Sequence, residues 1–98
     1  MNIKIRNNEY KIVKDIGETV SDLELEEIVT DYYDNFDYIV GDWAYGKVRL
    51  KGFNKHGSKY TKSYNDYDKV DDYIANKCAY GCKYFILEKV KRDVEKNS

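Results

Sequence analysis

The side chains that could perform chemistry in this sequence are few, and their spacing matches no familiar catalytic or metal-binding pattern. His56 is the single histidine, and Cys78 and Cys82 are the two cysteines. A nucleophile needs an adjacent base, and that base needs a partner that orients it. The residues around His56 suggest neither. Zinc needs about four nitrogen or sulfur ligands, which these three residues do not supply. We therefore expect no catalytic residue, no metal site and no cofactor.

The same two cysteines bear on the cellular compartment. The first apolar run extends only from Ile3 to Ile5 and is interrupted by Lys4, so it is too short for a signal peptide. No stretch approaches the ~20 apolar residues that cross a bilayer. We expect a cytoplasmic protein with no membrane contact, in which both thiols are reduced and packed in the core.

Charge along the chain is segregated, although the formal net charge is only −1. Residues 15–42 hold ten acids and no lysine or arginine, whereas residues 47–62 hold six cations and no acid. Such halves create an electrostatic dipole that can steer a charged partner. The pattern is equally typical of two solvated faces that keep a small domain in solution, and both interpretations stay open.

The length of 98 residues suits one domain, which can bury roughly two-thirds of its unfolded surface without a metal or a disulfide. Residues 1–90 are expected to form this single α+β domain. Residues 91–98 are mostly charged and polar, and we expect them to form a flexible tail.

The chain opens with the pattern of a β-hairpin. Asn7 and Asn8 suit a two-residue turn, because asparagine tolerates the positive φ that such turns need. This turn would place Ile5 opposite Tyr10 and make one face of the hairpin apolar. The second strand is expected to continue to Ile16.

A helix is predicted next, over residues 22–35. Ser21 and Glu24 have the spacing of a capping box, in which each side chain bonds the other residue's amide. Apolar residues then recur at intervals of three and four, which is typical of one helical face. They are Leu25, Ile28, Val29, Tyr32, Tyr33 and Phe36.

Three more strands are predicted after this helix. Residues 38–41 form a short apolar run typical of a buried strand, and residues 42–46 are expected to turn the chain. Residues 47–51 alternate charged and apolar side chains, which predicts a half-exposed strand. Residues 84–87 are apolar on both faces, which predicts a central strand.

A loop and a second helix lie between these strands. Residues 54–65 show no hydrophobic period, which predicts a loop of about twelve residues. Asp66 or Asp68 can then cap a helix that ends near Gly81.

The resulting order is strand, strand, helix, strand, strand, helix, strand, which indicates the α+β class. Short links between sequential strands favour a mainly antiparallel sheet, and we expect both helices to pack on one face of it. The pattern does not specify the order of the strands in space.

Two runs of this sequence resemble the signatures of the YutD-like family, a group of small bacterial proteins of unknown function. The first run is Asp37–Trp43, continuing as Tyr45-Gly46 and Arg49–Phe53; the second is Cys78, Tyr80–Cys82 and Tyr84-Phe85. The likeness extends over most of the chain up to Val90, and it departs at Ala44, where the family is expected to carry glycine. The family has no established activity. The resemblance therefore implies a compact α+β fold in the cytosol and transfers no functional residue.

Residues 43–53 offer a candidate binding surface that combines cations with aromatic rings. Alternation along a strand places Lys47, Arg49 and Lys51 on one face. Cations can hold phosphates, and a ring beside them can stack a base for about 1–3 kcal/mol. Edge strands also carry lysine simply to prevent aggregation. The candidate nucleic-acid surface is Trp43, Tyr45, Lys47, Arg49, Lys51, Phe53, Lys55, Lys59 and Lys62.

Protein–protein interaction is the function that the sequence favours. The acidic stretch offers Glu26, Glu27 and Asp31 to a partner of opposite charge. Binding to RNA or the ribosome comes second, because nucleic-acid-binding domains are usually basic and this chain is not. A small-molecule or catalytic role without a recognisable motif comes third. A monomer is favoured, and the identity of the partner stays open.

Overall fold

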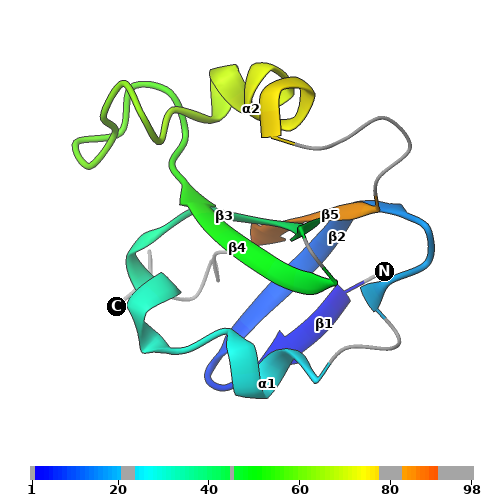
Figure 1. Cartoon of the computed structure of the whole chain (residues 1–98). Helices are drawn as coiled ribbons and strands as arrows, with labels where there is room; N and C mark the ends of the chain where they lie inside the picture. The colour runs from blue at the N-terminus through cyan, green and yellow to red at the C-terminus, as the bar shows by residue number, and fades with distance from the viewer. Residues whose placement is uncertain (1, 21–23, 45, 78–82, 91–98) are drawn as a thin grey trace.

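The last strand along the chain lies at the centre of the sheet. In the computed structural model, which describes residues 2–20, 24–44, 46–77 and 83–90, five strands pair in the order β1-β2-β5-β3-β4. Neighbouring strands all run antiparallel. The strands are β1 (Asn2–Ile5), β2 (Asn8–Ile16), β3 (Tyr38–Ala44), β4 (Lys47–Phe53) and β5 (Tyr84–Lys89), so β1 and β4 form the two edges (Figure 1).

Short helical segments lie between the strands. They are α1 (Leu25–Ile28), the 3-10 turns η2 (Asp31–Asn35) and η3 (Tyr67–Lys69), and α2 (Val70–Lys77). The predicted α+β class and the predicted order of elements are confirmed. No helix in the described part of the chain is long and apolar enough to cross a membrane.

The sheet carries a hydrophobic core on each face. Phe85 and Leu87 of β5 pack in the first core, while Ile86 between them packs in the second. Because side chains alternate across a strand, the two cores lie on opposite faces. α1 contributes Leu25 to the first core, and α2 contributes Val70 to the second. The expectation that both helices pack on one face is therefore wrong (Figure 1).

The reason is that β5 and its neighbour β3 are apolar on both faces of the sheet. In β3, Ile39 is buried in the first core and Val40 in the second. A strand that is apolar on both faces needs cover on both. The first core is Ile5, Tyr10, Val20, Leu25, Val29, Ile39, Phe85 and Leu87; the second is Tyr38, Val40, Phe53, Val70 and Ile86.

The N-terminal hairpin turns one residue earlier than predicted. Its turn residues are Arg6 and Asn7, and Ile3 rather than Ile5 lies opposite Tyr10. The predicted register is therefore wrong by two positions. An even shift keeps every side chain on its own face, so Ile5 and Tyr10 still belong to the first core.

α1 and η2 replace the single helix predicted over residues 22–35. The Arg6 guanidinium donates to the carbonyl oxygens of Val29 and Glu26, each at 3.0 Å. A continuing helix would bond these carbonyls to its own later amides. The β-branched run Ile28–Thr30 also disfavours helix, and the last turn of α1 carries no cation to complement the helix dipole.

β3 continues through the residues where a turn was predicted. Asp42 and Trp43 pair with Arg49 and Val48 of β4, because the Asp42 carboxylate binds the Arg49 side chain across the two strands. The chain turns within the predicted range of residues 42–46 but later than expected, because β3 continues to Ala44 and β4 begins at Lys47. Gly46, with a φ of 76°, lies in the tight connection between β3 and β4.

The loop and the start of the second helix agree with the sequence analysis. Residues 54–65 contain neither helix nor strand, apart from a single parallel bridge between Asn54 and Asp66. Asp66 caps η3 by accepting a hydrogen bond from the Asp68 amide at 2.9 Å.

Several expectations fall outside the described residues. They concern Ser21 of the capping box, Tyr45, Cys78, Cys82, the helix stop at Gly81 and the tail over residues 91–98. These expectations and the cytoplasmic location stay predictions.

Substitution of Gly52 of β4 tests whether Phe36, next to η2, packs directly on the strand. A Cβ atom at this position would lie 2.3 Å from Cγ of the Phe36 ring. We expect Gly52→Ala to lower the free energy of unfolding, measured in urea, by about 1–3 kcal/mol. In a Phe36→Ala background the loss should be clearly smaller, because the ring atoms that the new Cβ would meet are gone. An equal loss in both backgrounds would contradict this account.

Candidate functional site

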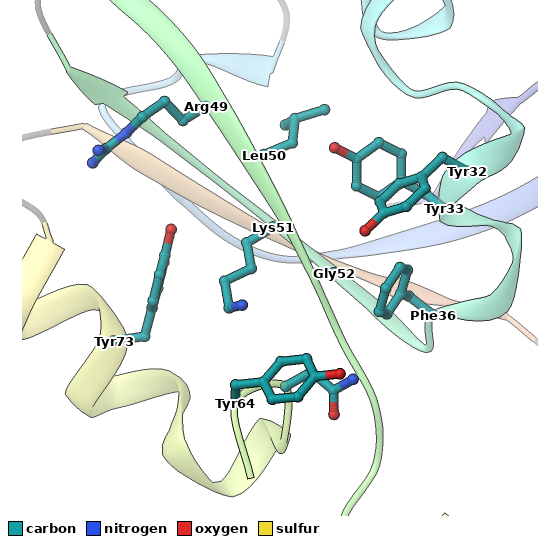
Figure 2. A pocket seen from close by; sticks show the side chains of 10 residues that line it. Tyr32, Tyr33, Phe36, Arg49, Leu50, Lys51, Gly52, Tyr64 and Tyr73 are labelled. Atoms are coloured by element: carbon teal, nitrogen blue, oxygen red, sulfur yellow. The ribbon is translucent and has the colours of Figure 1, made fainter. Parts of the chain in front are cut away.

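A groove of about 360 Å³ runs along the edge strand β4. β4 forms its floor, and aromatic side chains stand on both sides of the strand (Figure 2). We call one side the η2 wall (Tyr32, Tyr33 and Phe36) and the other the α2 wall (Tyr64, Asn65 and Tyr73). The floor residues are Arg49, Leu50, Lys51 and Gly52.

The η2 wall is a cluster of three rings. Tyr32 meets Tyr33 edge-on, with ring centroids 4.9 Å apart, and its centroid lies 5.6 Å from that of Phe36. Thr30 starts the turn by accepting a hydrogen bond from the Tyr32 amide at 3.4 Å. Phe36 packs on Gly52 of the floor. The Tyr32 residue is 66% exposed, so the wall offers an aromatic surface to a ligand.

Two strands fasten η2 to the sheet through Asp34. The Asn8 side chain donates to the Asp34 carboxylate at 2.8 Å, and the Lys89 ammonium donates to the Asp34 carbonyl oxygen. Burial raises the pKa of nearby Tyr10 to about 12, and the Asp34 charge adds to this rise. Tyr10 therefore stays neutral. The hydrogen bonds from Asn8 of β2 and Lys89 of β5 attach η2 to the sheet.

The α2 wall surrounds the one amine of the floor. The Lys51 ammonium lies 5.3 Å from the ring centroid of Phe53 and 5.8 Å from those of Tyr64 and Tyr73. These distances are within the range of cation–π attraction. Tyr73 meets Phe53 edge-on at 5.4 Å, and Tyr64 is 69% exposed. Among the described residues, no carboxylate forms an ion pair with Lys51.

The other cation of the floor is already paired. Asp42 of β3 is 1% exposed, and its oxygens accept from Arg49 Nε at 3.2 Å and from a terminal guanidinium nitrogen at 2.9 Å. A buried carboxylate without such a partner is strongly unfavourable. Because Asp42 offsets the charge of Arg49, Lys51 supplies the net positive charge of the groove.

The outer edge of β4 directs main-chain groups toward the groove. The Asn54 amide donates to the Asn65 carbonyl at 2.8 Å, and the Asn54 carbonyl accepts from the Tyr67 amide at 2.9 Å. Both groups therefore point away from β3. Since these groups alternate in direction along a strand, Gly52 and Leu50 direct theirs outward as well. No strand within the described residues pairs with this edge.

The loop that carries Tyr64 is closed by a polar cluster. Nδ1 of His56 lies 2.7 Å from one Asp66 carboxylate oxygen and 3.5 Å from an Asp68 oxygen. The ligand atoms of these three residues lie within 4.8 Å of one another, which is a set that could meet a divalent cation. Both Asp66 oxygens, however, already accept hydrogen bonds that shape the loop.

Comparison with known proteins identifies the family. The sequence profile of the family described as "Putative antitoxin YutD-like" matches residues 4–88. The chain belongs to the YutD-like family. It is 32% identical over 90 residues to "Putative antitoxin YutD" of Bacillus subtilis (strain 168), which spans 92% of this chain and 99% of that protein. The solution NMR structure of the B. subtilis yutD protein has a TM-score of 0.76 at 32% identity, covering 94% of this chain and 84% of that one.

The residues that carry the YutD-like resemblance have structural roles. A Cβ atom at Gly41 would lie 2.2 Å from the Phe85 ring, so the glycine admits that ring to the first core. Asp42 binds Arg49, and Trp43 meets Phe85 edge-on with centroids 6.1 Å apart. This run of the signature therefore secures the packing of β3, β4 and β5.

The predicted basic and aromatic stripe is only partly assembled. Arg49 and Lys51 lie together in the groove floor. Phe53 is 1% exposed in the second core, and Trp43 packs against the first core on the opposite face. Lys47, Lys55, Lys59 and Lys62 are exposed outside the groove, and Tyr45 lies outside the described residues. Binding of nucleic acid by these residues stays a prediction.

The three acids predicted to meet a protein partner are all exposed. Glu26 and Glu27 belong to α1, whereas Asp31 belongs to η2. Because the predicted helix is interrupted between them, they do not share one helical face. Their contact with a partner stays a prediction.

The pattern of the sequence does not predict the aromatic residues of the groove. Its periodicity places Tyr32 and Phe36 on one helical face, and nothing in it gives Tyr64 or Tyr73 a role in a site. Two signals were present in the sequence: eleven tyrosines in 98 residues, and Thr30, a good capping residue, inside the predicted helix. Neither signal shows that the rings meet across β4.

Arg49→Met should destabilise the fold by leaving the buried Asp42 carboxylate without its partner. We expect the free energy of unfolding in urea to fall by about 1–3 kcal/mol. The matched control is Lys47→Met, an exposed cation of the same strand, which should change stability by less than about 0.5 kcal/mol. The double variant Asp42→Leu with Arg49→Met should recover much of the loss. If Arg49→Met and Lys47→Met lower the free energy of unfolding equally, Arg49 does not stabilise the fold through Asp42.

The His56 tether predicts a pH dependence of the loop. The hydrogen bond with Asp66 raises the pKa of His56 above its ordinary value of 6.5, and the charges of Asp66 and Asp68 add to this rise. The stabilising contribution is therefore full below pH 6.5 and is lost as pH rises through the raised pKa. In an NMR titration, Asp66→Asn should lower the pKa of the imidazole more than Asp68→Asn does. The opposite ranking would contradict the geometry.

Proposed function

We propose that this YutD-like protein is a protein-binding module that holds one partner protein through the groove along β4. The observation that carries the proposal is a strand edge without a neighbouring strand in the described residues, flanked on both sides by exposed tyrosines. Peptide-recognition surfaces commonly combine an open strand edge with pockets for side chains.

The exposed rings favour a protein ligand. Tyr32 is 66% exposed and Tyr64 is 69% exposed, and they stand on opposite walls of the groove. Tyrosine is enriched in protein interfaces because it buries a large ring and keeps a hydroxyl for a hydrogen bond. The two rings are therefore the best candidates for the residues that contribute most of the binding energy.

The description of the relatives supports the same direction. The B. subtilis protein that is 32% identical is described as a putative antitoxin. An antitoxin acts by counteracting a toxin, and a groove that holds a segment of another protein is a physical means to do so. We include this role in the proposal for the present chain.

Nucleic-acid binding is a second candidate, supported by exposed cations on the loop over residues 54–65. Lys59 lies over the Tyr60 ring, 5.0 Å from its centroid, and Tyr60 is 56% exposed. Two stripe residues weigh against this candidate, because Phe53 is buried and Arg49 is paired with an acid. A small molecule could also use the groove, whose volume of about 360 Å³ suits such ligands.

The test is capture of the partner by the tagged protein in its own cells, with and without nuclease. We expect the wild-type protein to retain one protein that resists nuclease treatment. Substitution of both Tyr32→Ala and Tyr64→Ala should reduce its recovery at least about tenfold, because these rings would lose their contact with it. Both side chains are exposed, so the folded state should persist.

Tyr60→Ala is the matched control, because Tyr60 is also an exposed tyrosine but does not line the groove. Recovery from this variant should equal that of the wild type. If the captured material is RNA, or if the groove variant and the control retain the partner equally well, the proposal fails.

A further inference from the structure

We infer that the groove binds an extended segment of the partner that alternates acidic and apolar side chains, as an added strand along β4. This inference rests on the proposed function and specifies the chemistry of its ligand. It goes beyond a general protein-binding role because it assigns the main chain, the acidic positions and the apolar positions to separate parts of the site.

The main chain of β4 supplies the first part. Leu50 and Gly52 direct their amide and carbonyl groups to the outer edge, as the bonds of Asn54 to Asn65 and Tyr67 indicate. The parallel bridge between Asn54 and Asp66 closes one end of this edge with the protein's own chain. A partner strand that hydrogen-bonds to the main chain of Leu50 and Gly52 would add to the sheet next to this bridge.

Lys51 supplies the second part. Its ammonium lies near the ring of Phe53 and near the two rings of the α2 wall. The Lys51 residue is partly buried, and its ammonium has no carboxylate partner among the described residues. A bound strand would cover this amine further and remove water from it. Covering an amine without compensation is costly, so the partner side chain that faces the α2 wall must supply a carboxylate.

The η2 wall supplies the third part. Tyr32, Tyr33 and Phe36 present ring surface to the groove, and the same turn carries the exposed acids Asp31 and Asp34. An acidic side chain on this side would approach like charges, whereas an apolar side chain would bury against the rings. Since successive side chains of a strand point to opposite sides, an acidic residue toward Lys51 requires an apolar residue next to it toward η2.

A second copy of this chain fits the edge poorly. Lys47, Arg49 and Lys51 recur at every second position of β4. Arg49 is paired with Asp42, but pairing of two such edges would still bring the lysines of both copies together, and lysine on an edge strand is a known device against self-association. An acidic strand meets the same lysines with the opposite charge, so charge complementarity favours a different protein over a second copy.

The experiment uses the full-length protein and labelled peptides of about ten residues, the length of a long strand. The main probe alternates valine and glutamate, and its binding is measured by fluorescence anisotropy. A second probe alternates valine and lysine. A third is the valine–glutamate peptide with an N-methyl group on every residue, which removes its main-chain donors on both edges.

We expect the valine–glutamate peptide to bind, and both comparison peptides to bind at least about tenfold more weakly. Lys51→Met should weaken the valine–glutamate peptide about tenfold, whereas Lys51→Arg, which keeps the charge, should change its affinity less than about threefold. Tyr64→Ala should weaken binding and Tyr60→Ala should not. Binding should also fall as salt is added, because the contact with Lys51 is ionic.

Each contrary result overturns a defined part. Equal binding of the valine–lysine peptide, or no effect of Lys51→Met, overturns the acidic preference. Equal binding of the methylated peptide overturns strand addition. If no peptide binds while capture of the cellular partner still depends on Tyr32 and Tyr64, this inference fails and the proposed function stands. If capture is independent of those tyrosines as well, both fail.

Discussion

The structure depends on a buried carboxylate that must be neutralised across two strands. Asp42 is 1% exposed, and the Arg49 side chain of β4 donates to both of its carboxylate oxygens. The two residues are direct partners, so a slip of β4 by even one position would separate them. The pair therefore fixes the register of β4 against β3. With that register, Gly52 comes to lie under Phe36 and Lys51 under the rings of the α2 wall.

The groove exists because the sheet is covered on both faces and open at one edge. α1 and η2 pack over one side, and η3 and α2 pack over the other. β4 is the edge strand between these two layers, so rings from segments about thirty residues apart lie on either side of it (Figure 2). Gly52 has no side chain, which lets the Phe36 ring pack directly on β4 and form part of the η2 wall.

The sequence predicted the strands well, because each has a local signature. Alternation in residues 47–51 and the doubly apolar run 84–87 both led to strands, and the second was correctly placed at the centre. The failures had non-local causes. The long helix is ended by Arg6, which lies more than twenty positions away and occupies two of its carbonyls. The groove likewise joins tyrosines from distant segments, and no spacing of residues predicts that they meet across β4. The sequence showed the cations of β4, but it did not show that Arg49 pairs with Asp42 or that Tyr73 lies beside Lys51.

The position of β5 has a consequence for how the chain reaches this structure. β1 and β2 form one hairpin and β3 and β4 another, and β5 alone joins them. An isolated hairpin is barely stable in water, and neither hairpin has its neighbouring strand until residues 84–89 arrive. During synthesis, the ribosome has already released the segments that make both walls before the strand that unites them is available. Assembly of the groove is thereby tied to completion of the chain through β5, and a shortened product carries the residues of the groove without the groove itself.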